Sequence, residues 1–246
     1  MQDTAEAAAE RDQVAAGILP HRYGVPWQQP FLDRVSTALR PGVRILDAGS
    51  GARPVVPPAC RPRGCHYAGL DVSAAELDRA GSAAYDERIV ADIGKPSALI
   101  ENRFDLVVSW QVLEHVASMR AALDVQHRAL AAAGRMIAMV SGSLGLYAVL
   151  ARIIPYRVST AIQERLLHID GADKFPTRYD SCRASRLSKL LTQGGWRSHE
   201  IVPLYKGGTY FSFSPALMSL YLRYENAIWR ADRRELATHY IIDAMR

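Results

Sequence analysis

Three aspartates stand where short apolar runs of the sequence end, and each could bind a polar group of a ligand. Asp47 ends the first run and precedes a turn with Gly49 and Gly51, whose missing Cβ atoms let a ligand approach the backbone. Asp71 follows the second run at about the spacing of the ribose-binding carboxylate in dinucleotide-binding folds, and Asp92 follows the third. Because the carboxyl ends of parallel strands share one edge of a sheet, these residues indicate a nucleotide-like ligand at that edge.

The turn after Asp47 does not suit a dinucleotide. Pro54 stands where the third glycine of G-x-G-x-x-G would be, and it has no backbone N–H to donate. No helix is indicated in residues 55–62, so a pyrophosphate would lack the helix N-terminus that it needs. S-adenosylmethionine fits the turn better, because it has a ribose, an adenine and an amino-acid tail but no phosphate.

Five segments resemble, in their order and spacing, the class I S-adenosylmethionine-dependent methyltransferases. They are ILDAGSG, GLDVS, VADIG, FDLVVSWQVLEHV and AGRMIAMVSG, within residues 43–141. The resemblance implies an α/β fold with a Rossmann-like, seven-stranded, mostly parallel sheet, helices on both faces and a last strand inserted antiparallel between the fifth and sixth. It also implies S-adenosylmethionine as cofactor and methyl transfer as the reaction. The stretch GSGARP resembles a bacterial branch that acts on natural products, sugars or cell-surface intermediates.

The resemblance also places the cofactor against the turn and the strand ends. The residues expected to bind it are Arg22, Asp47, Gly49, Gly51, Asp71, Val72, Asp92, Ile93 and Trp110. Among them, Asp71 would bind the ribose hydroxyls, Asp92 the adenine amino group, and Ile93 or Trp110 would pack near the ring. Asp47 and the glycines would lie beside the methionine moiety. Arg22 either pairs with the methionine carboxylate or belongs to a loop that packs onto the core.

Two histidines are candidate catalytic residues, because a base accelerates methyl transfer to a hydroxyl at neutral pH. His115 follows the fourth predicted strand, in an LEHV turn that could instead pack the next helix. His168 stands in a long insertion, where it either lines the acceptor pocket or is a solvated loop residue. Ubiquinone-type O-methyltransferases bind a divalent metal through a similar E-x-x-E-H stretch. Here Gln111 replaces the first acid, so no metal is expected.

Strand-like and helix-like segments alternate along the chain, which predicts a doubly wound sheet with right-handed crossovers. Helices are expected over residues 4–16, 29–39, 73–83, 118–132, 185–193 and 215–234, with Gly134 ending the fourth of them. A last strand is expected over 238–243.

We expect one methyltransferase domain over 1–246, with a helical N-terminal lid over 1–40 and a helical cap inserted at 143–182, after the fifth strand. The insertion contains an apolar run over 145–154 that is too short for the ~20 residues that span a bilayer. It could be a substrate cap, a membrane-surface segment or a dimer contact.

Composition narrows the class of protein. The 246 residues are 49% hydrophobic, enough for a full core, and the net charge is +5 without a dense basic run, so no nucleic-acid partner is expected. Three cysteines form neither an even framework nor a C-x-x-C pair, which favours a reducing compartment and no zinc. The start of the sequence is acidic and lacks the pattern of a signal peptide, so we expect a cytoplasmic protein, monomeric or homodimeric.

Two functions remain open from the sequence. The first is methyl transfer to a small-molecule or carrier-bound acceptor that is partly hydrophobic, most often at a hydroxyl oxygen, with nitrogen or carbon as alternatives. The second is a non-catalytic partner protein with a degenerate methyltransferase fold, suggested by Arg53 and Pro54 in the turn. The three strand-end acids favour the first, because a core that only had to pack would gain little from them.

Overall fold

The computed structural model describes residues 12–14, 16–146, 148–149 and 177–246. The expected helix over 4–16, most of the inserted cap and His168 therefore lie wholly or largely outside the described residues.

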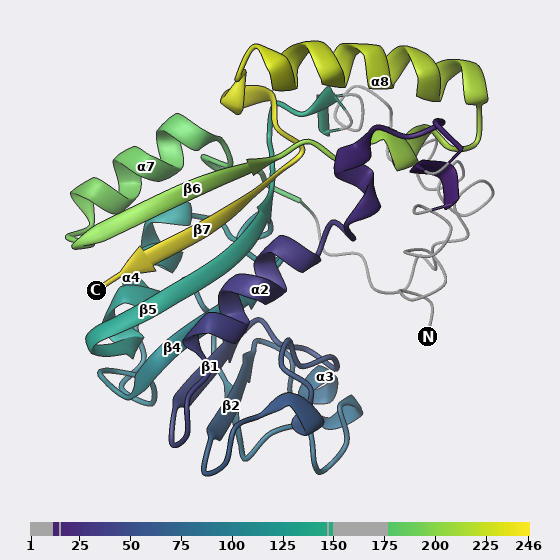
Figure 1. The fold of residues 1–246 in the computed structure, drawn as a ribbon. Helices are drawn as coiled ribbons and strands as arrows, with labels where there is room; N and C mark the ends of the chain where they lie inside the picture. Colours follow the sequence, from purple (N-terminus) through teal and green to yellow (C-terminus); the bar gives the residue numbers. More distant parts are fainter. Residues whose placement is uncertain (1–11, 15, 147, 150–176) are drawn as a thin grey trace.

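The described residues form a seven-stranded sheet with the order β3-β2-β1-β4-β5-β7-β6 (Figure 1). The strands are β1 (Arg44–Ala48), β2 (His66–Asp71), β3 (Glu87–Val90), β4 (Phe104–Trp110), β5 (Leu130–Ser141), β6 (Ser198–Leu204) and β7 (His239–Met245). Strands β1 to β5 are parallel, and β7 runs antiparallel to both neighbours, β5 and β6. The predicted sheet and the antiparallel insertion of its last strand are confirmed.

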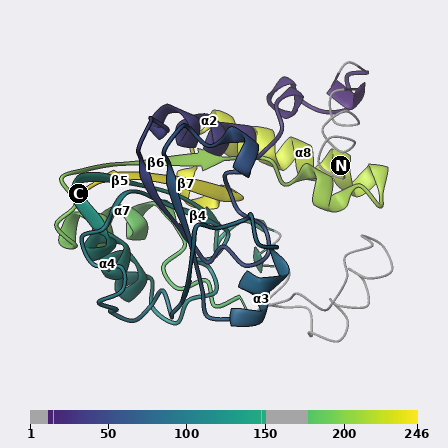
Figure 2. The same ribbon diagram turned by 90° about the horizontal axis from the view of Figure 1, so that it is seen from below.

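Helices cover both faces of the sheet, as Figure 2 shows. They are α2 (Gln29–Ala38), α3 (Ala74–Arg79), α4 (Met119–Ala129), α7 (Ala184–Gln193) and α8 (Pro215–Arg230), with 3-10 turns η1 (His21–Gly24), η2 (Pro58–Cys60), η4 (Gly208–Phe211) and η5 (Arg234–Leu236). The buried side chains of α2 belong to the core of one face, whereas those of α4 and α7 belong to the core of the other. Among the described helices, none is long and apolar enough to cross a membrane.

The fourth helix ends earlier than predicted, and Gly134 does not end it. Helix α4 stops at Ala129, and Leu130 already pairs with Phe104 in the sheet. Leu130 is fully buried, so placing it in the core outweighs the helix propensity of the alanines that follow. Gly134 lies within β5, where a Cβ would come 2.9 Å from the Ala131 carbonyl oxygen. The strand is bulged here, since Ala133 has φ +60° and the register shifts.

Three other boundaries also differ from the prediction. Helix α3 ends at Arg79, two residues before Gly81 with φ +80°. Helix α8 ends at Arg230, before Asp232 with φ +46°. Strand β3 ends at Val90, so Asp92 lies two residues beyond the sheet. In each case the local backbone leaves the regular element before the apolar pattern does.

Candidate functional site

Asp47, at the carboxyl edge of β1, braces the turn that follows it. Its side chain is buried, and its Oδ2 accepts hydrogen bonds from the Tyr67 hydroxyl at 2.5 Å and from the Val55 N–H at 2.8 Å. Burial raises the pKa of Asp47 to about 6, against the opposing effect of these two bonds. Asp47 thus ties the far end of the turn to the middle of the sheet, and the chain after Gly51 folds back past Pro54.

The two glycines of this turn have different surroundings. Gly49 has φ +80°, and a Cβ there would lie 2.4 Å from Val112 Cγ2, in the turn after β4. Gly51 has φ +50°, and the nearest atom to its would-be Cβ is Asp71 Oδ2 at 3.8 Å. The space at Gly49 is therefore filled by the protein itself, whereas Gly51 leaves room beside a carboxylate.

Asp71, at the end of β2, is fixed by two backbone donors. The Gly51 N–H donates to its Oδ2 at 3.0 Å, and the Ser73 N–H donates to its Oδ1 at 2.9 Å. Each carboxylate oxygen has a second lone pair, so Asp71 can still accept hydrogen bonds from a ligand. Val72, next to it, is 57% exposed. The structure therefore presents Asp71 at the open side of the turn, as a ribose-binding carboxylate requires.

Asp92 lies at the same edge, because Asp71 pairs with Val90 at the end of β3. The Gly94 N–H donates to Asp92 Oδ1 at 2.8 Å, and this bond is the main reason why the pKa of Asp92 is lowered. Lys95 pairs with its other oxygen at 3.2 Å. Ile93 turns the opposite way and is buried in the core that α4 and α7 cover.

Trp110 ends β4 and packs toward α2. Its ring lies 5.0 Å from that of Trp27 and 5.0 Å from that of Phe31. Trp110 and Ile93, the two residues expected near an adenine, thus belong to the cores of opposite faces of the sheet. Gln111 follows with φ +52°, an uncommon conformation for a residue with a side chain, and turns the chain away from the strand.

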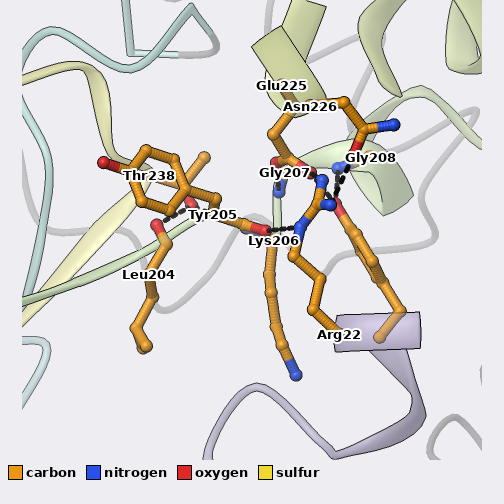
Figure 3. Close-up of polar contacts among 10 residues, drawn as sticks. Arg22, Leu204, Tyr205, Lys206, Gly207, Gly208, Glu225, Asn226 and Thr238 are labelled. Carbon is orange, nitrogen blue, oxygen red and sulfur yellow. Dashed lines mark hydrogen bonds and ion pairs between the residues drawn. The ribbon is translucent and has the colours of Figure 1, made fainter. Parts of the chain in front are cut away.

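Arg22 belongs to a separate group of residues, which we call the Glu225 cluster: Arg22, Tyr23, Gly207, Gly208, Glu225 and Asn226 (Figure 3). Arg22 pairs with the fully buried Glu225, donates to Asn226 Oδ1 at 2.5 Å and donates to the Tyr205 carbonyl at 2.9 Å. Each of its guanidinium nitrogens thus has a protein partner. A role for Arg22 in binding the cofactor stays a prediction.

Glu225 also accepts from the Tyr23 hydroxyl at 2.6 Å and from the Gly207 N–H at 2.7 Å. The pKa of Tyr23 is raised, because burial and the neighbouring carboxylate both disfavour a phenolate. These bonds join η1 to α8 and to the loop after β6, and they anchor the segment that leads to Trp27. This cluster could not be predicted from the sequence, since its members lie at opposite ends of the chain.

The structure describes one of the two candidate bases, His115. His115 is half-buried in the turn after β4, and its backbone N–H donates to the Val112 carbonyl at 2.9 Å. His168 lies outside the described residues. Within the described part of the chain, no three His, Cys, Asp or Glu side chains gather as metal ligands.

Two further ionisable side chains at this edge were missed. Glu114 is buried, and its Oε1 accepts from the Ser141 hydroxyl at 2.7 Å and from the Ser141 N–H at 3.2 Å; burial raises its pKa. His239, the first residue of β7, is buried and stacks on Trp27 at 4.9 Å, and burial lowers its pKa to about 4. A polar residue at the head of an apolar last strand is the signal that could have identified His239.

Solved structures with the same fold include three methyltransferases of known source. An Archaeoglobus fulgidus S-adenosylmethionine-dependent methyltransferase is 15% identical with a TM-score of 0.58, over 89% of this chain and 92% of that one. Geranyl diphosphate C-methyltransferase from Streptomyces coelicolor is 15% identical with a TM-score of 0.57, over 91% and 77%. Phosphoethanolamine N-methyltransferase 2 from Haemonchus contortus is 15% identical with a TM-score of 0.55, over 91% of this chain. This chain spans about half, 53%, of the nematode protein.

No curated protein matches the sequence. The family model described as a methyltransferase domain matches residues 21–200, which include the turn, the three strand-end acids and strands β1 to β5. The chain therefore belongs to the methyltransferase domain family, in the class I S-adenosylmethionine-dependent group whose sheet order it has.

Proposed function

We propose that the protein transfers a methyl group from S-adenosylmethionine to a hydroxyl oxygen of a small-molecule or carrier-bound acceptor. The observation that carries this proposal is the space at Gly51, which opens beside the carboxylate of Asp71 while the Gly51 N–H holds that carboxylate in place. The hydroxyl groups of a ribose need a hydrogen-bond acceptor that is held in place and is open to the ligand. The residues present therefore fit the cofactor.

When bound, S-adenosylmethionine supplies an electrophilic methyl group on a sulfonium. Asp71 would hold its ribose hydroxyls and Asp92 its adenine amino group, and the residues over β4 and β5 would hold the acceptor in line with the methyl carbon. Such alignment is worth ~7–11 kcal/mol in favourable cases, so positioning is the main contribution of the chain. His115, in the turn after β4, is the proposed recipient of the hydroxyl proton, which adds ~10²–10⁴-fold. His168 is the other candidate for this role.

The acceptor is proposed to be partly hydrophobic, because Trp27, Phe31 and Trp110 gather beside the strand ends. Nitrogen and carbon acceptors are the alternatives, and the fold does not choose among them: of the similar structures, one is named a C-methyltransferase and another an N-methyltransferase. A biosynthetic role in the cytoplasm, as a monomer or homodimer, with small molecules rather than nucleic acid as substrates, completes the proposal. As an alternative, the insertion would bring the protein into peripheral contact with a membrane surface.

Calorimetric titration with S-adenosylmethionine and S-adenosylhomocysteine tests the cofactor. We expect micromolar binding that Asp71→Ala weakens about thirtyfold. Asp105→Ala is the matched control, because Asp105 also accepts a backbone N–H, that of Arg44 at 3.0 Å, but at the start of β4. Failure of the intact, folded protein to bind either compound would favour a partner protein with a degenerate fold, and unchanged binding by Asp71→Ala would refute the assigned site.

A further inference from the structure

Several buried polar atoms at the carboxyl edge have no hydrogen-bond partner among the described residues, and two of them belong to a carboxyl and an imidazole side chain. They are Glu114 Oε2, in the turn after β4, and His239 Nδ1, at the start of β7. Native proteins pair nearly all of their buried polar atoms, so an unpaired one calls for an explanation. A ligand that is present during the working cycle is one such explanation.

The two atoms share a neighbour, Ser141, at the end of β5. Ser141 lies directly opposite His239 in the antiparallel pair, so the two side chains project from the same face of the sheet. The Ser141 hydroxyl reaches the other oxygen of Glu114 at 2.7 Å. Ser141 is therefore a neighbour of both Glu114 and His239.

One indole ring lies on His239, and a second indole ring lies beside the first. Trp27 stacks on His239 with the ring centroids 4.9 Å apart and also lies 5.0 Å from Trp110, at the end of β4. Strand β4 stands between β1, whose turn leads to Asp71, and β5. The pair of unpaired atoms is thus on the side of Trp110 away from the proposed cofactor site, at the same edge of the sheet.

Three other buried residues also have unpaired atoms, and they provide a comparison. Gln126 lies within α4, Ser50 lies in the turn after β1, and Tyr205 directly follows β6. An unpaired atom alone is therefore not a site. Glu114 and His239 differ because they share the neighbour Ser141 and because the Trp27 ring stacks on His239.

We propose that Glu114 and His239 bind the polar group of the methyl acceptor, and that this group is a hydroxyl or amino group carried on an apolar or aromatic body. The inference rests on the proposed function and names the substrate class of that site. The side chain of His239 is uncharged near neutral pH and that of Glu114 carries no positive charge, so the pair offers nothing to neutralise an anion. A carboxylate or phosphate is excluded at this position, and the indoles of Trp27 and Trp110 pack against the apolar body. Since both atoms are covered, the ligand enters by displacing the Trp27 side chain.

Three probes of similar size distinguish these groups: 2-phenylethanol, 2-phenylethylamine and phenylacetate. Each is titrated into the full chain loaded with S-adenosylhomocysteine, and binding is followed by ligand-observed NMR. We expect the alcohol and the amine to bind at least tenfold more tightly than phenylacetate. Equal or tighter binding of phenylacetate, or no binding of any probe, would overturn the proposal.

Variants locate the binding. His239→Phe keeps a ring against Trp27 but removes Nδ1, and it should lower the affinity for 2-phenylethanol at least tenfold. His239→Gln keeps a polar side-chain atom and should restore part of that affinity. His127→Phe is the matched control, because His127 also contacts a tryptophan, Trp196 at 5.0 Å, but from helix α4 on the other face. Equal affinity of 2-phenylethanol for His239→Phe and the unsubstituted protein would refute the assignment.

Two readouts keep the test independent of folding and of the proposed function. In the unsubstituted chain labelled with ¹⁵N-histidine, the ring signals that His239→Phe removes should change their nitrogen shifts when 2-phenylethanol is added; an unchanged spectrum would contradict the proposal. S-adenosylhomocysteine should bind His239→Phe as it binds the unsubstituted protein. If the unsubstituted protein fails to bind S-adenosylhomocysteine, the proposed function fails, and probe binding without it then decides the fate of this site separately.

Discussion

The carboxyl edge of the sheet has two halves that satisfy their polar residues differently. In the cofactor half, at the ends of β1, β2 and β3, Asp47, Asp71 and Asp92 each accept a backbone N–H from the turn that follows. In the acceptor half, at the ends of β4 and β5 and the start of β7, Glu114 and His239 each keep one unpaired atom. The three acids of the cofactor half are paired without a ligand, although Ser50 Oγ in the same half is unpaired, whereas Glu114 and His239 in the acceptor half each have an unpaired atom. Under the proposed function, a cofactor shared by many enzymes would suit the paired acids, and selectivity for the acceptor would reside in the other half.

The largest expected effect is that of Gly49→Ala, which creates a clash where the two halves touch. A Cβ would lie 2.4 Å from Val112 Cγ2, and φ is +80°, so overpacking and backbone strain add to about 4 kcal/mol of lost unfolding free energy. Urea unfolding measures it. Gly51→Ala, with 3.8 Å of clearance, should cost only about 1 kcal/mol. Adding Val112→Ala should recover part of the Gly49→Ala loss; no recovery would show that the two turns are not in close contact.

One buried residue of each half, Asp47 and His239, should respond oppositely to pH. Burial raises the pKa of Asp47 from 3.8 to about 6, so its neutral form stabilises the fold at low pH and that stability is lost as pH rises through about 6. Burial lowers the pKa of His239 from 6.5 to about 4, so its stability is present above about pH 6.5 and is lost as pH falls through about 4. Each shift corresponds to about 3 kcal/mol, and the two contributions oppose one another between these limits.

Single variants separate these opposing contributions. On acidification from about pH 7 to 4, the unfolding free energy of His239→Gln should rise relative to that of the unsubstituted protein, and that of Asp47→Asn should fall relative to it. The double variant should follow the unsubstituted protein, because the two contributions that it lacks oppose one another. Parallel profiles for the two single variants would contradict the contrast between the halves.

Asp71→Ala should weaken S-adenosylhomocysteine binding about thirtyfold, which is ~2 kcal/mol and typical of a hydrogen bond to a charged group. Its effect on 2-phenylethanol binding should be small, because Asp71 belongs to the cofactor half alone. Calorimetry with both compounds gives the two affinities. A comparable loss for both would mean that the halves are coupled.

The smallest effects compare two tyrosines. Tyr23 donates to Glu225 at 2.6 Å and anchors the segment that leads to Trp27, whereas Tyr85 donates to the Gly51 carbonyl at 2.9 Å in the cofactor turn. Each Tyr→Phe change should cost about 1 kcal/mol of stability. Tyr23→Phe should alter tryptophan fluorescence and leave S-adenosylhomocysteine binding unchanged, and Tyr85→Phe should do the reverse. The same response from both variants would remove the distinction.

The places of the three acids near the strand ends could be predicted from the sequence because the signals are local. Asp47 and Asp71 lie at the ends of β1 and β2, Asp92 lies two residues beyond β3, and the glycine turn directly follows the first of these strands. The seven-stranded sheet and the place of its last strand followed from the resemblance. The sequence does not show why a residue without a Cβ is required at position 49, because Val112 contacts Gly49 from a turn 63 positions away in sequence.

The acceptor half could not be predicted, because its contacts join residues that are distant in sequence. His239 reaches the carboxyl edge only because β7 is antiparallel, so the first residue of β7 meets the last residue of β5. Glu114 looked like part of a helix-packing turn until Ser141 was seen to occupy only one of its oxygens. The end of α4 was wrong because burial of Leu130 is a tertiary effect that local propensity does not contain.

The Glu225 cluster has a consequence for biosynthesis of the chain. Its bonds join Tyr23 to a residue 202 positions later, so they cannot form until almost all of the described sequence has left the ribosome. Until then residues 21–28, which include Trp27, are not anchored, although β4 and β5 have already been synthesised. Contacts between such distant residues form slowly and expose apolar surface meanwhile. The cover over His239 is therefore among the last parts of the molecule to assemble, and a nascent chain arrested before α8 would present an open acceptor half to chaperones.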